Sequence, residues 1–372
     1  MIPVFRPSMG IEEVEAVKEV LLSGWIGLGP KTEEFEKKFA QYIGVKYAVA
    51  LNSATAALHL AMAVLNIEGK EVVTTPMTFI STNHAILYNR GIPVFADIEP
   101  DTLNINPKEI TKNISPKTKA IVVVHYGGHA CDMDKIIKIA KKHKLYLVED
   151  AAHGCGGEYK GKKLGSLGDL GCFSFHAVKN LATGDGGMIT TNNKNFYEKI
   201  KKLRWLGINK DTWSREKNEQ TYGLKYSWYY EVEDVGFKYH MNDITAALGL
   251  VQLKKLDKMN ARRKKITQIY NKNFADLDWL ETPIVKDYAE SSHHNYVIKT
   301  ELRDKLNEYL AQKGISTGVH YIPNNHYKMY RQCRGKTPVS DKIWKKLLTL
   351  PLYPDMTEAE ISQVVSAIRS FR

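Results

Sequence analysis

Short apolar runs alternate with helical patterns through the first half of the chain. This alternation is typical of a mostly parallel β-sheet with helices packed against it, and it predicts an α/β fold. Asp132, just before Met133, is expected to cap one of the helices through its side-chain oxygen. The segments predicted as strands are 47–51, 71–74, 92–96, 120–125, 145–148, 171–175 and 187–191.

Beyond Met241 the pattern becomes that of one long helix, with Ile244, Leu248 and Val251 on a single face. A chain of 372 residues usually divides into two domains. We therefore predict a large domain of residues 1–250, and a smaller C-terminal α+β domain of residues 251–372 joined to it by this helix. The smaller domain is expected to contain a strand at 296–299 and helices near 302–313 and 358–368.

The segment 209–233 is rich in tryptophan, tyrosine and charged residues. We expect it to lie over a substrate or a partner subunit.

Composition narrows the class of protein. The chain is 43% hydrophobic and 25% charged, which is ordinary for a soluble globular protein. Its longest apolar run, 56–65, is too short to span a membrane, and its first residues have no signal-peptide pattern. We therefore expect a cytoplasmic protein with no membrane partner. The four cysteines are irregularly spaced, so reduced thiols are expected rather than a disulfide framework.

The net charge of +12 is distributed over many segments. The densest lysine runs, 135–144 and 254–265, alternate with apolar residues as in amphipathic helices. Solvated helix faces therefore explain the charge better than a nucleic-acid site, and no nucleic-acid partner is expected. The surplus charge favours an anionic substrate.

Asp150 and Lys179 are the strongest candidates for chemistry. Asp150 ends the apolar run 145–148, and ligands of parallel sheets bind at the carboxyl ends of strands. Lys179 lies between apolar residues and a glycine-rich segment, where an unpaired ammonium would be costly. A loop and a returning strand would bring the two groups to opposite sides of one flat cofactor. Pyridoxal phosphate needs such a pair, an amine for the Schiff base and a carboxylate for the pyridine nitrogen.

Each candidate also has a simpler explanation. Asp150 alone would more commonly cap a helix, and Lys179 alone would more commonly be a surface lysine. Ser53 and Thr55 follow a predicted strand and open a helix, so the free amides there would suit a phosphate, although simple helix capping is the commoner role. Phe79 follows the next strand, where it would stack on the cofactor ring or pack in the core.

The order and spacing of several motifs resemble the sugar aminotransferases of the DegT/DnrJ/EryC1/StrS family, and the resemblance covers nearly the whole chain. Each motif is weak by itself, but together they are specific. The motifs are GWIGLGP at 24–30, NSATAAL at 52–58, PMTF at 76–79, EDAAH at 149–153, SFHAVKN at 174–180, GDGG at 184–187 and VHY at 319–321.

The resemblance implies an aspartate-aminotransferase-like enzyme of fold type I. Such an enzyme uses pyridoxal phosphate, passes through pyridoxamine phosphate, and moves an amino group from L-glutamate, which becomes 2-oxoglutarate, to a nucleotide-linked keto-sugar. The expected sugar is a 4-keto-6-deoxyhexose and the alternative is a 3-keto-hexose. The product would serve surface polysaccharide, glycan or secondary-metabolite synthesis. Family members are homodimers whose active sites lie between the subunits.

The resemblance also assigns roles by position. Lys179 corresponds to the Schiff-base lysine, Asp150 to the partner of the pyridine nitrogen, and His153 to the residue near the ring hydroxyl. Phe79 takes the ring-stacking position. The positions that contact phosphate are Ser53, Ala54 and Ser174.

Candidates for the sugar nucleotide come from the same family positions. Trp25, His320 and Tyr321 occupy positions near the substrate, and Lys238 or Arg204 would meet a diphosphate. Packing or surface roles are open alternatives for each of them.

The chain departs from the family pattern at three positions. Ala177 replaces a frequent proline and Asp185 a frequent glutamate. Lys238 stands where the family usually has an asparagine that reaches the phosphate of the neighbouring subunit's cofactor, so a point charge would replace an amide there. Related dehydratases have histidine in place of the Schiff-base lysine, and Lys179 distinguishes the chain from them.

Two other classes of protein would use some of the same residue types. A metal-dependent hydrolase would use neutral imidazoles and thiolates as ligands, but their spacing matches no common zinc pattern, and no metal is expected. The candidate ligands would be His125, His129, Cys131, His153 and Cys155. A DNA-binding regulator would need a recognition helix with a basic face, and no helix-turn-helix pattern stands out.

Overall fold

A computed structural model describes residues 1–209 and 230–371. Most of the predicted excursion at 209–233 therefore lies outside the described residues. The helices are α1 (Ile11–Ser23), α2 (Pro30–Ile43), α3 (Ala54–Val64), α4 (Ile80–Tyr88), α5 (Pro107–Asn113), α6 (Met133–His143), α7 (Lys194–Leu203), α9 (Asp243–Phe274), α10 (Arg303–Gln312), α11 (Pro338–Ile343) and α12 (Glu358–Arg369). The strands are β1 (Tyr47–Leu51), β2 (Glu71–Thr74), β3 (Ile92–Phe95), β4 (Thr118–Val124), β5 (Tyr146–Asp150), β6 (Glu158–Tyr159), β7 (Lys162–Lys163), β8 (Leu170–Ser174), β9 (Gly187–Thr191), β10 (Ala289–Glu290), β11 (Tyr296–Lys299) and β12 (Leu347–Leu350).

The central sheet has seven strands in the order β1-β9-β8-β5-β4-β2-β3. Strand β9 pairs antiparallel with both β1 and β8, and the pairs from β8 to β3 are parallel. The prediction of a mostly parallel sheet is therefore confirmed. Because β1 and β8 have the same direction, the carboxyl ends of β1, β2, β4, β5 and β8 meet at one edge of the sheet.

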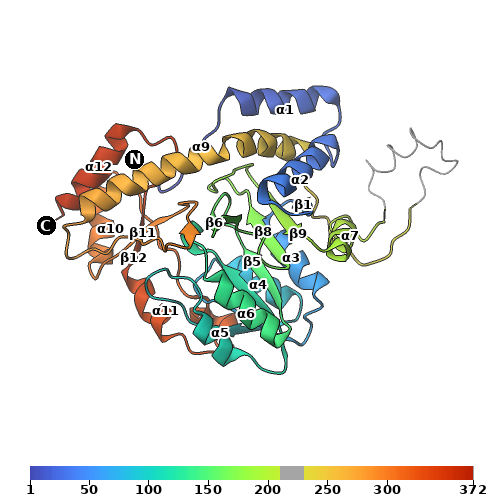
Figure 1. Ribbon diagram of the computed structural model, residues 1–372. Coiled ribbons are helices and arrows are strands. Elements are labelled where there is room, and N and C mark those ends of the chain that lie inside the picture. The colour runs from blue at the N-terminus through green and yellow to red at the C-terminus, as the bar shows by residue number, and fades with distance from the viewer. Residues whose placement is uncertain (210–229, 372) are drawn as a thin grey trace.

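Side chains on alternate positions of each strand pack into different cores, so the sheet is covered on both faces (Figure 1). Val49 and Leu51 of β1 pack with α3 and α7, whereas Ala48 and Ala50 pack with α2 and α9. Toward the other edge, Ile121 and the rest of the second face pack against α5 and α6. Burial on both faces is what makes these strands continuous apolar runs in the sequence.

The connection from β5 to β8 differs from the expected loop and returning strand. The short strands β6 and β7 pair in a separate three-stranded sheet with β10, and β8 then runs parallel to β5. Apolar residues on both strands favour insertion into the buried sheet over a simple hairpin. As a result, Asp150 and Ser174 both end their strands at the same edge of the sheet.

Helix α9 runs along one side of the molecule, from α1 and α2 to the C-terminal part (Figure 1). It has 32 residues and continues without interruption past residue 250. Its second half, with Ile266 and Tyr270, packs in a separate core that also contains β11, β12, α10 and α12, together with Ile2 from the N-terminus. The predicted domain limits, 1–250 and 251–372, stay a prediction.

Local predictions in this part agree with the structure. The predicted strand 296–299 is β11, and the helices predicted near 302–313 and 358–368 are α10 and α12.

Other local predictions concern the rest of the chain. Asp132 caps α6 as expected, accepting a hydrogen bond from the Lys135 amide. All four cysteines are free thiols. No helix in the part of the chain that the structure describes is long and apolar enough to cross a membrane.

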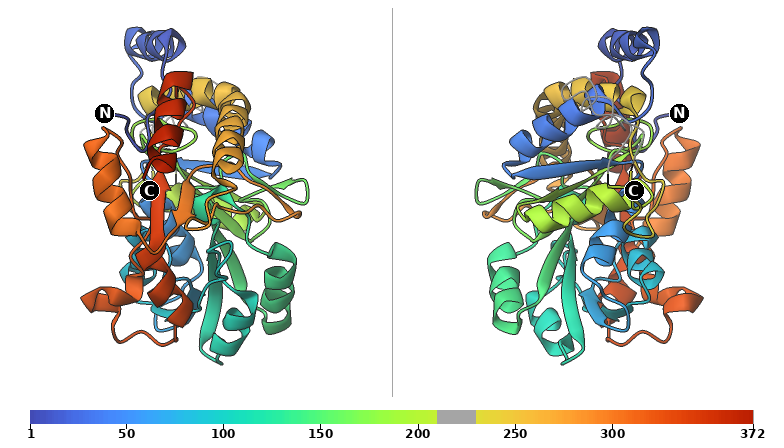
Figure 2. Two further views of the ribbon diagram at one scale, coloured as in Figure 1. Left: turned by 90° about the vertical axis from the view of Figure 1, so that its left-hand side faces the viewer. Right: turned by 90° about the vertical axis from the view of Figure 1, so that its right-hand side faces the viewer.

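Helix α1 lies at the periphery of the fold. It stands apart from the rest of the body at the top of both views in Figure 2 and packs on α9. Several large apolar side chains on it are exposed, and Leu22 is 78% exposed. Such a surface is unusual for an isolated chain and is typical of an interface.

Candidate active site

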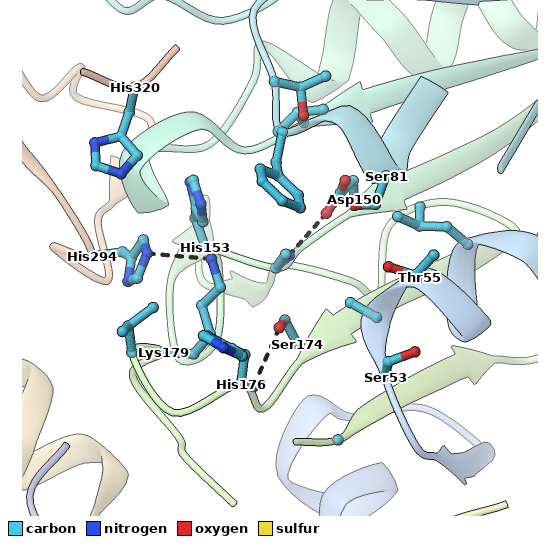
Figure 3. A pocket seen from close by; sticks show the side chains of 18 of the residues that line it. Ser53, Thr55, Ser81, Asp150, His153, Ser174, His176, Lys179, His294 and His320 are labelled. Carbon is cyan, nitrogen blue, oxygen red and sulfur yellow. Dashed lines mark hydrogen bonds between the residues drawn. The ribbon is translucent and has the colours of Figure 1, made fainter. Parts of the chain in front are cut away.

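A cavity of about 360 Å³ opens at the carboxyl edge of the sheet (Figure 3). Its walls come from the ends of β5 and β8, the starts of α3 and α4, and loops of the C-terminal part. Among the predicted site residues, those that line this cavity are Ser53, Ala54, Thr55, Phe79, Asp150, His153, Ser174, Lys179, His320 and Tyr321.

Asp150 lies at one end of the cavity, as the last residue of β5. Its carboxylate accepts hydrogen bonds from the Thr82 hydroxyl at 2.7 Å and from the Ala152 amide at 3.1 Å. Thr82 in turn shares a hydrogen bond with the Thr78 hydroxyl at 2.8 Å. Burial raises the pKa of Asp150 above its usual value, while these hydrogen bonds and the charge of Lys179 oppose that rise. The fold thus buries a carboxylate whose charged form would be stabilised by a positively charged group of a ligand.

The start of α3 forms the other end of the cavity. Ser53 caps this helix by accepting a hydrogen bond from the Ala56 amide at 3.0 Å. The amides of Ala54 and Thr55 precede the regular helical bonding and have no acceptor among the described residues. They line the cavity together with Ser174 from the end of β8. Free amides at a helix start attract a phosphate, so this end of the cavity suits an anion.

Gly187 allows β9 to lie directly against the start of α3. A Cβ atom at this position would lie 2.3 Å from the Ser53 carbonyl oxygen and 2.7 Å from the Ala54 amide nitrogen. We therefore expect Gly187→Ala to displace the helix start and to weaken binding of the cofactor predicted from the sequence, pyridoxal phosphate, by about tenfold or more. Titration of the cofactor into the cofactor-free protein measures this change. Gly27→Ala is the control, because its Cβ would meet no atom within 4 Å, and equal affinities of the two variants would contradict the prediction.

Lys179 extends into the cavity from the loop after β8, beside His153 and His294 (Figure 3). Its amine lies 3.5 Å from the His294 Nε2 atom. Burial lowers the pKa of Lys179 to about 8, and the charge of Asp150 opposes this effect. At neutral pH the amine is therefore much closer to losing its proton than an ordinary lysine, as a nucleophile and base requires.

Two histidines and a tyrosine form the wall beside Lys179. His153 accepts a hydrogen bond at Nδ1 from the Gly127 amide, so its Nε2 carries the hydrogen and donates to the Tyr321 hydroxyl at 3.0 Å. The His320 Nδ1 atom shares a hydrogen bond with the Thr349 hydroxyl at 2.8 Å. Burial lowers the pKa of His320 to about 4, and it lowers the pKa of His153 well below its usual value. These imidazoles are therefore neutral beside Lys179.

Phe79 is the residue immediately before α4 and is 60% exposed, so core packing does not explain it. Its ring faces Tyr321, with 6.2 Å between the ring centroids. An exposed aromatic ring at the mouth of a cavity is available to cover a flat ligand.

The structure does not bring the other predicted substrate residues to this cavity. Arg204 is 2% exposed, and its guanidinium donates hydrogen bonds to the Glu36 carboxylate and the Ala50 carbonyl oxygen. Trp25 donates from its indole nitrogen to the Leu28 carbonyl oxygen at 3.0 Å. Lys238 is exposed and places its ammonium 3.5 Å from the centroid of the Trp205 ring. Arg204 therefore has the packing role that the sequence left open as an alternative.

We expect Arg204→Met to lower the free energy of unfolding by about 3 kcal/mol, because it leaves the buried Glu36 carboxylate without its partner. The KM for the sugar nucleotide predicted from the sequence should not change. Urea denaturation measures the first quantity and steady-state kinetics the second. Lys202→Met, which breaks a more exposed pair with Glu233, is the control and should leave the unfolding midpoint where it is. A stable Arg204→Met protein with a raised KM would restore the substrate role.

The sequence prediction missed several residues of the site. Thr82 holds Asp150, His294 contacts Lys179, and Phe5 lines the cavity from the N-terminal segment. Thr82 lies six residues after Pro76, in the helix that follows β2. This position near the carboxyl end of a strand could have marked Thr82 as a site residue. No local pattern marks Phe5 or His294, because long-range packing alone brings them to the cavity.

The side chains proposed as metal ligands have other partners. His125 pairs with the Glu149 carboxylate at 2.9 Å, and His129 shares hydrogen bonds with the Ala130 carbonyl oxygen and the Lys286 amide. The Cys131 thiol donates to the Val124 carbonyl oxygen. Within residues 1–209 and 230–371, no group of three or more histidine, cysteine or acidic side chains could hold a metal ion.

The cavity fits pyridoxal phosphate on its own chemistry. Free amides at the start of α3 suit the phosphate, Asp150 provides a buried carboxylate for a protonated ring nitrogen, and Lys179 provides an amine with a lowered pKa. The fold and the site define the class of the protein, which is a pyridoxal phosphate-dependent aminotransferase. The chain belongs to the DegT/DnrJ/EryC1/StrS aminotransferase family, which it matches over residues 7–369.

Known proteins of this kind resemble the chain over its whole length. The spore coat polysaccharide biosynthesis protein SpsC of Bacillus subtilis is 42% identical over 380 residues, which cover 99% of this chain and 96% of SpsC. The putative sugar aminotransferase Spr1654 of Streptococcus pneumoniae, in its pyridoxamine phosphate (PMP) form, superimposes with a TM-score of 0.92 at 31% identity and covers 100% of this chain and 99% of its own. Spr1654 is also known in its pyridoxal phosphate (PLP) form.

A second solved structure is similar to the same extent. PseC of Helicobacter pylori, an aminotransferase involved in the biosynthesis of pseudoaminic acid, superimposes with a TM-score of 0.91 at 30% identity, covering 100% of this chain and 98% of PseC.

Proposed function

We propose that the enzyme transfers the amino group of L-glutamate to the keto group of a nucleotide-linked 4-keto-6-deoxyhexose. The observation that carries this proposal is the arrangement of Lys179, Asp150 and the start of α3 around one cavity. The names of the relatives support the sugar class, because SpsC belongs to spore coat polysaccharide biosynthesis and Spr1654 is described as a putative sugar aminotransferase. The product would accordingly serve a surface polysaccharide or a related glycan.

Pyridoxal phosphate, when bound, supplies a conjugated ring that accepts the electron pair of a broken C–H bond. The residues of this chain bind it and move the proton. The start of α3 and Ser174 would hold the phosphate, and Phe79 would cover the ring. The Asp150 carboxylate would keep the ring nitrogen protonated, because a positive charge beside this buried carboxyl group favours its ionised form.

Lys179 has two roles in this proposal. It would anchor the cofactor covalently, and once displaced by the amino donor its amine would be free to act as a base. The Lys179 Nζ atom would then take the proton from the α carbon of glutamate and pass it to the cofactor, and it would run the same transfer in reverse at the sugar carbon. A pKa near 8 suits both directions, because the amine is able to accept and release a proton at neutral pH.

The sugar nucleotide is proposed to enter beside His320 and Tyr321, which line the open side of the cavity. Trp25 and Lys238 lie outside the cavity of their own chain and are proposed to complete the site of a second copy. The exposed apolar residues of α1 support such a dimer, because an interface would cover them. Light scattering of the purified protein should give twice the 42.2 kDa mass of one chain.

A screen of nucleotide keto-sugars tests the proposed function. The enzyme is incubated with pyridoxal phosphate, L-glutamate and each 4-keto-6-deoxy sugar or 3-keto-hexose, and the amino-sugar product and 2-oxoglutarate are measured by mass spectrometry. Amination of a 4-keto-6-deoxyhexose supports the proposal, and preference for a 3-keto-hexose would replace the substrate but keep the reaction. No amination of any keto-sugar would overturn it.

A further inference from the structure

We propose that Asn180 and His294 form a hydrogen-bonded relay that positions the Lys179 amine. This inference rests on the proposed role of Lys179 as the reacting amine. The relay begins at a backbone carbonyl of residue 292, passes through two buried side chains, and ends at the Lys179 Nζ atom. Figure 3 shows its last contact, between His294 and Lys179. His294 acts through Lys179, so it is a positioning residue.

The orientation of the Asn180 amide follows from its partners. Its Nδ2 atom donates to the Ser292 carbonyl oxygen at 2.8 Å and to the Asn260 Oδ1 atom at 2.8 Å. A backbone carbonyl oxygen is able only to accept a hydrogen bond, so the atom facing Ser292 must be the amide nitrogen. The Asn180 Oδ1 atom therefore faces His294, and Asn180 is 3% exposed, so water does not compete for it.

This orientation decides the tautomer of His294. The Asn180 Oδ1 atom lies 2.9 Å from the His294 Nδ1 atom and is able only to accept, so Nδ1 carries the hydrogen. In a neutral imidazole the other nitrogen is then an acceptor, and Nε2 presents its lone pair to the Lys179 amine at 3.5 Å. Burial holds the pKa of His294 well below its usual value, and the neighbouring His153 and Lys179 add to that effect. The ring therefore stays neutral and keeps this tautomer.

Packing fixes the plane of the His294 ring. The Phe5 ring stacks on it with a centroid distance of 5.3 Å and an interplanar angle of 2°. The His153 ring covers it with a centroid distance of 4.3 Å. The imidazole is 2% exposed, so its lone pair points in one direction without a competing solvent molecule.

The relay gives the Lys179 amine a defined orientation. With one N–H directed to His294 Nε2, the lone pair of the neutral amine is free to point into the cavity. When Nζ takes the proton from the substrate carbon, the electron pair of that C–H bond passes into the cofactor and the new ammonium keeps its hydrogen bond to His294. A separation of 3.5 Å is long for this bond, as is common before substrate binds.

Few other groups near Lys179 could accept a hydrogen bond from its amine. The titratable groups that influence or face Lys179 are Asp150, His153, His294 and His320, with Arg263 behind His294. His153 directs its Nε2 hydrogen to Tyr321, and Asp150 bonds to Thr82 and the Ala152 amide. Among the described residues, His294 has the only acceptor nitrogen within hydrogen-bond distance of the amine in this structure.

The first test determines the tautomer of His294 in the full-length protein without cofactor. Nitrogen-15 NMR of histidine-labelled protein, assigned with His294→Gln, is expected to show a protonated Nδ1 and a bare Nε2. Asn180→Leu should abolish this signature, because it removes the acceptor that holds the Nδ1 hydrogen. A protonated Nε2 in the unaltered protein would overturn the relay.

The second test follows the reactivity of Lys179. The protein without cofactor is treated with 1-fluoro-2,4-dinitrobenzene at a series of pH values, and the labelled Lys179 peptide is quantified by mass spectrometry. We compare His294→Phe, which keeps a ring against Phe5 but has no acceptor, with His294→Gln, whose amide oxygen is able to replace Nε2. His293→Asn is the matched control, because asparagine tolerates the positive φ of 50° at that buried position.

An acceptor stabilises the ammonium more than the neutral amine. His294→Phe is therefore expected to move the reactivity midpoint of Lys179 from near pH 8 to a value about one pH unit lower. His294→Gln and His293→Asn should remain within about 0.3 unit of the unaltered protein. The relay is wrong if His294→Phe leaves the midpoint in place, or if His294→Gln shifts it as far as His294→Phe does.

Measurements of the transamination rate distinguish a failure of this inference from a failure of the proposed function. If Lys179→Ala retains transamination, the proposed role of Lys179 fails, yet the tautomer and the midpoint still report on the relay. If Lys179 is essential, His294→Phe should lower kcat about tenfold with little change in KM, and His294→Gln should restore most of it. Full kcat in His294→Phe would contradict a positioning role.

Discussion

Replacing Lys179 with alanine is expected to lower transamination by about 10⁴-fold, because it removes both the covalent anchor of the cofactor and the base that moves the proton. The variant should still bind pyridoxal phosphate through the start of α3 and Asp150. Borohydride reduction, which traps a covalent link between the cofactor and Lys179, should label the unaltered enzyme and leave the variant unlabelled. Mass spectrometry of the 179-containing peptide measures this difference, and the glutamate-dependent formation of 2-oxoglutarate measures the rate.

Lys162→Ala is the matched control for this experiment, since Lys162 is an exposed lysine of the small strand β7, outside the cavity. It should change neither the label nor the rate. Retention of about a tenth or more of the activity by Lys179→Ala would remove Lys179 from the proposed mechanism, since a base that is lost cannot be replaced so well by water.

Asp150→Asn should lower the rate by about 10³-fold while cofactor binding persists. Asparagine has nearly the same shape and is able to keep the hydrogen bond from Thr82, but it has no charge with which to hold a proton on the ring nitrogen. The ring would then accept electrons poorly. The measurements are kcat for the glutamate half-reaction and the cofactor dissociation constant.

Thr82→Val is the control for Asp150→Asn, because it removes a hydrogen bond but keeps the carboxylate. It should lose about tenfold or less. Equal losses in the two variants would mean that the orientation of the carboxylate, and not its charge, is what the reaction needs.

Asp150→Asn should not lower the free energy of unfolding of the cofactor-free protein, although it lowers the rate of the reaction. Burial raises the pKa of Asp150 above its ordinary value of 3.8, so the folded state disfavours the ionised form. The resulting destabilisation is present at neutral pH and disappears as the pH falls below that value, where the group is protonated in both states. The variant without cofactor should therefore be at least as stable as the unaltered protein at pH 7, as urea denaturation would show, and bound cofactor should favour the unaltered protein.

Local sequence signals were sufficient to predict most strands of the central sheet. The segments predicted at 47–51, 71–74 and 187–191 coincide with β1, β2 and β9, because strands buried on both faces are continuous apolar runs bounded by polar or glycine residues. The path between β5 and β8 was not predictable in the same way. The strands β6 and β7 have only two residues each, and their pairing with β10 depends on a segment far along the chain.

Candidate site residues were predictable where one strand end or one helix start carries the signal. Asp150 and Ser53 are of this kind. Arg204 shows the limit, because nothing near it in the sequence distinguishes a substrate ligand from a buried partner of Glu36, which lies 168 residues away. Charge alone is the same in both cases, and the difference lies in what the folded chain places opposite the guanidinium.

The amino-acid sequence by itself determined the α/β class, the positions of Asp150 and Ser53 at element ends, the place of Lys179 before a glycine-rich segment, and the resemblance to a family of sugar aminotransferases. These properties follow from short-range patterns of apolar residues, caps and motifs, which act before distant parts of the chain meet. Only the tertiary structure decided that Thr82 holds Asp150 and that Asn180 turns His294 toward Lys179. Those contacts join residues 68 and 114 or more positions apart, so packing of separate elements creates them and no local pattern encodes them.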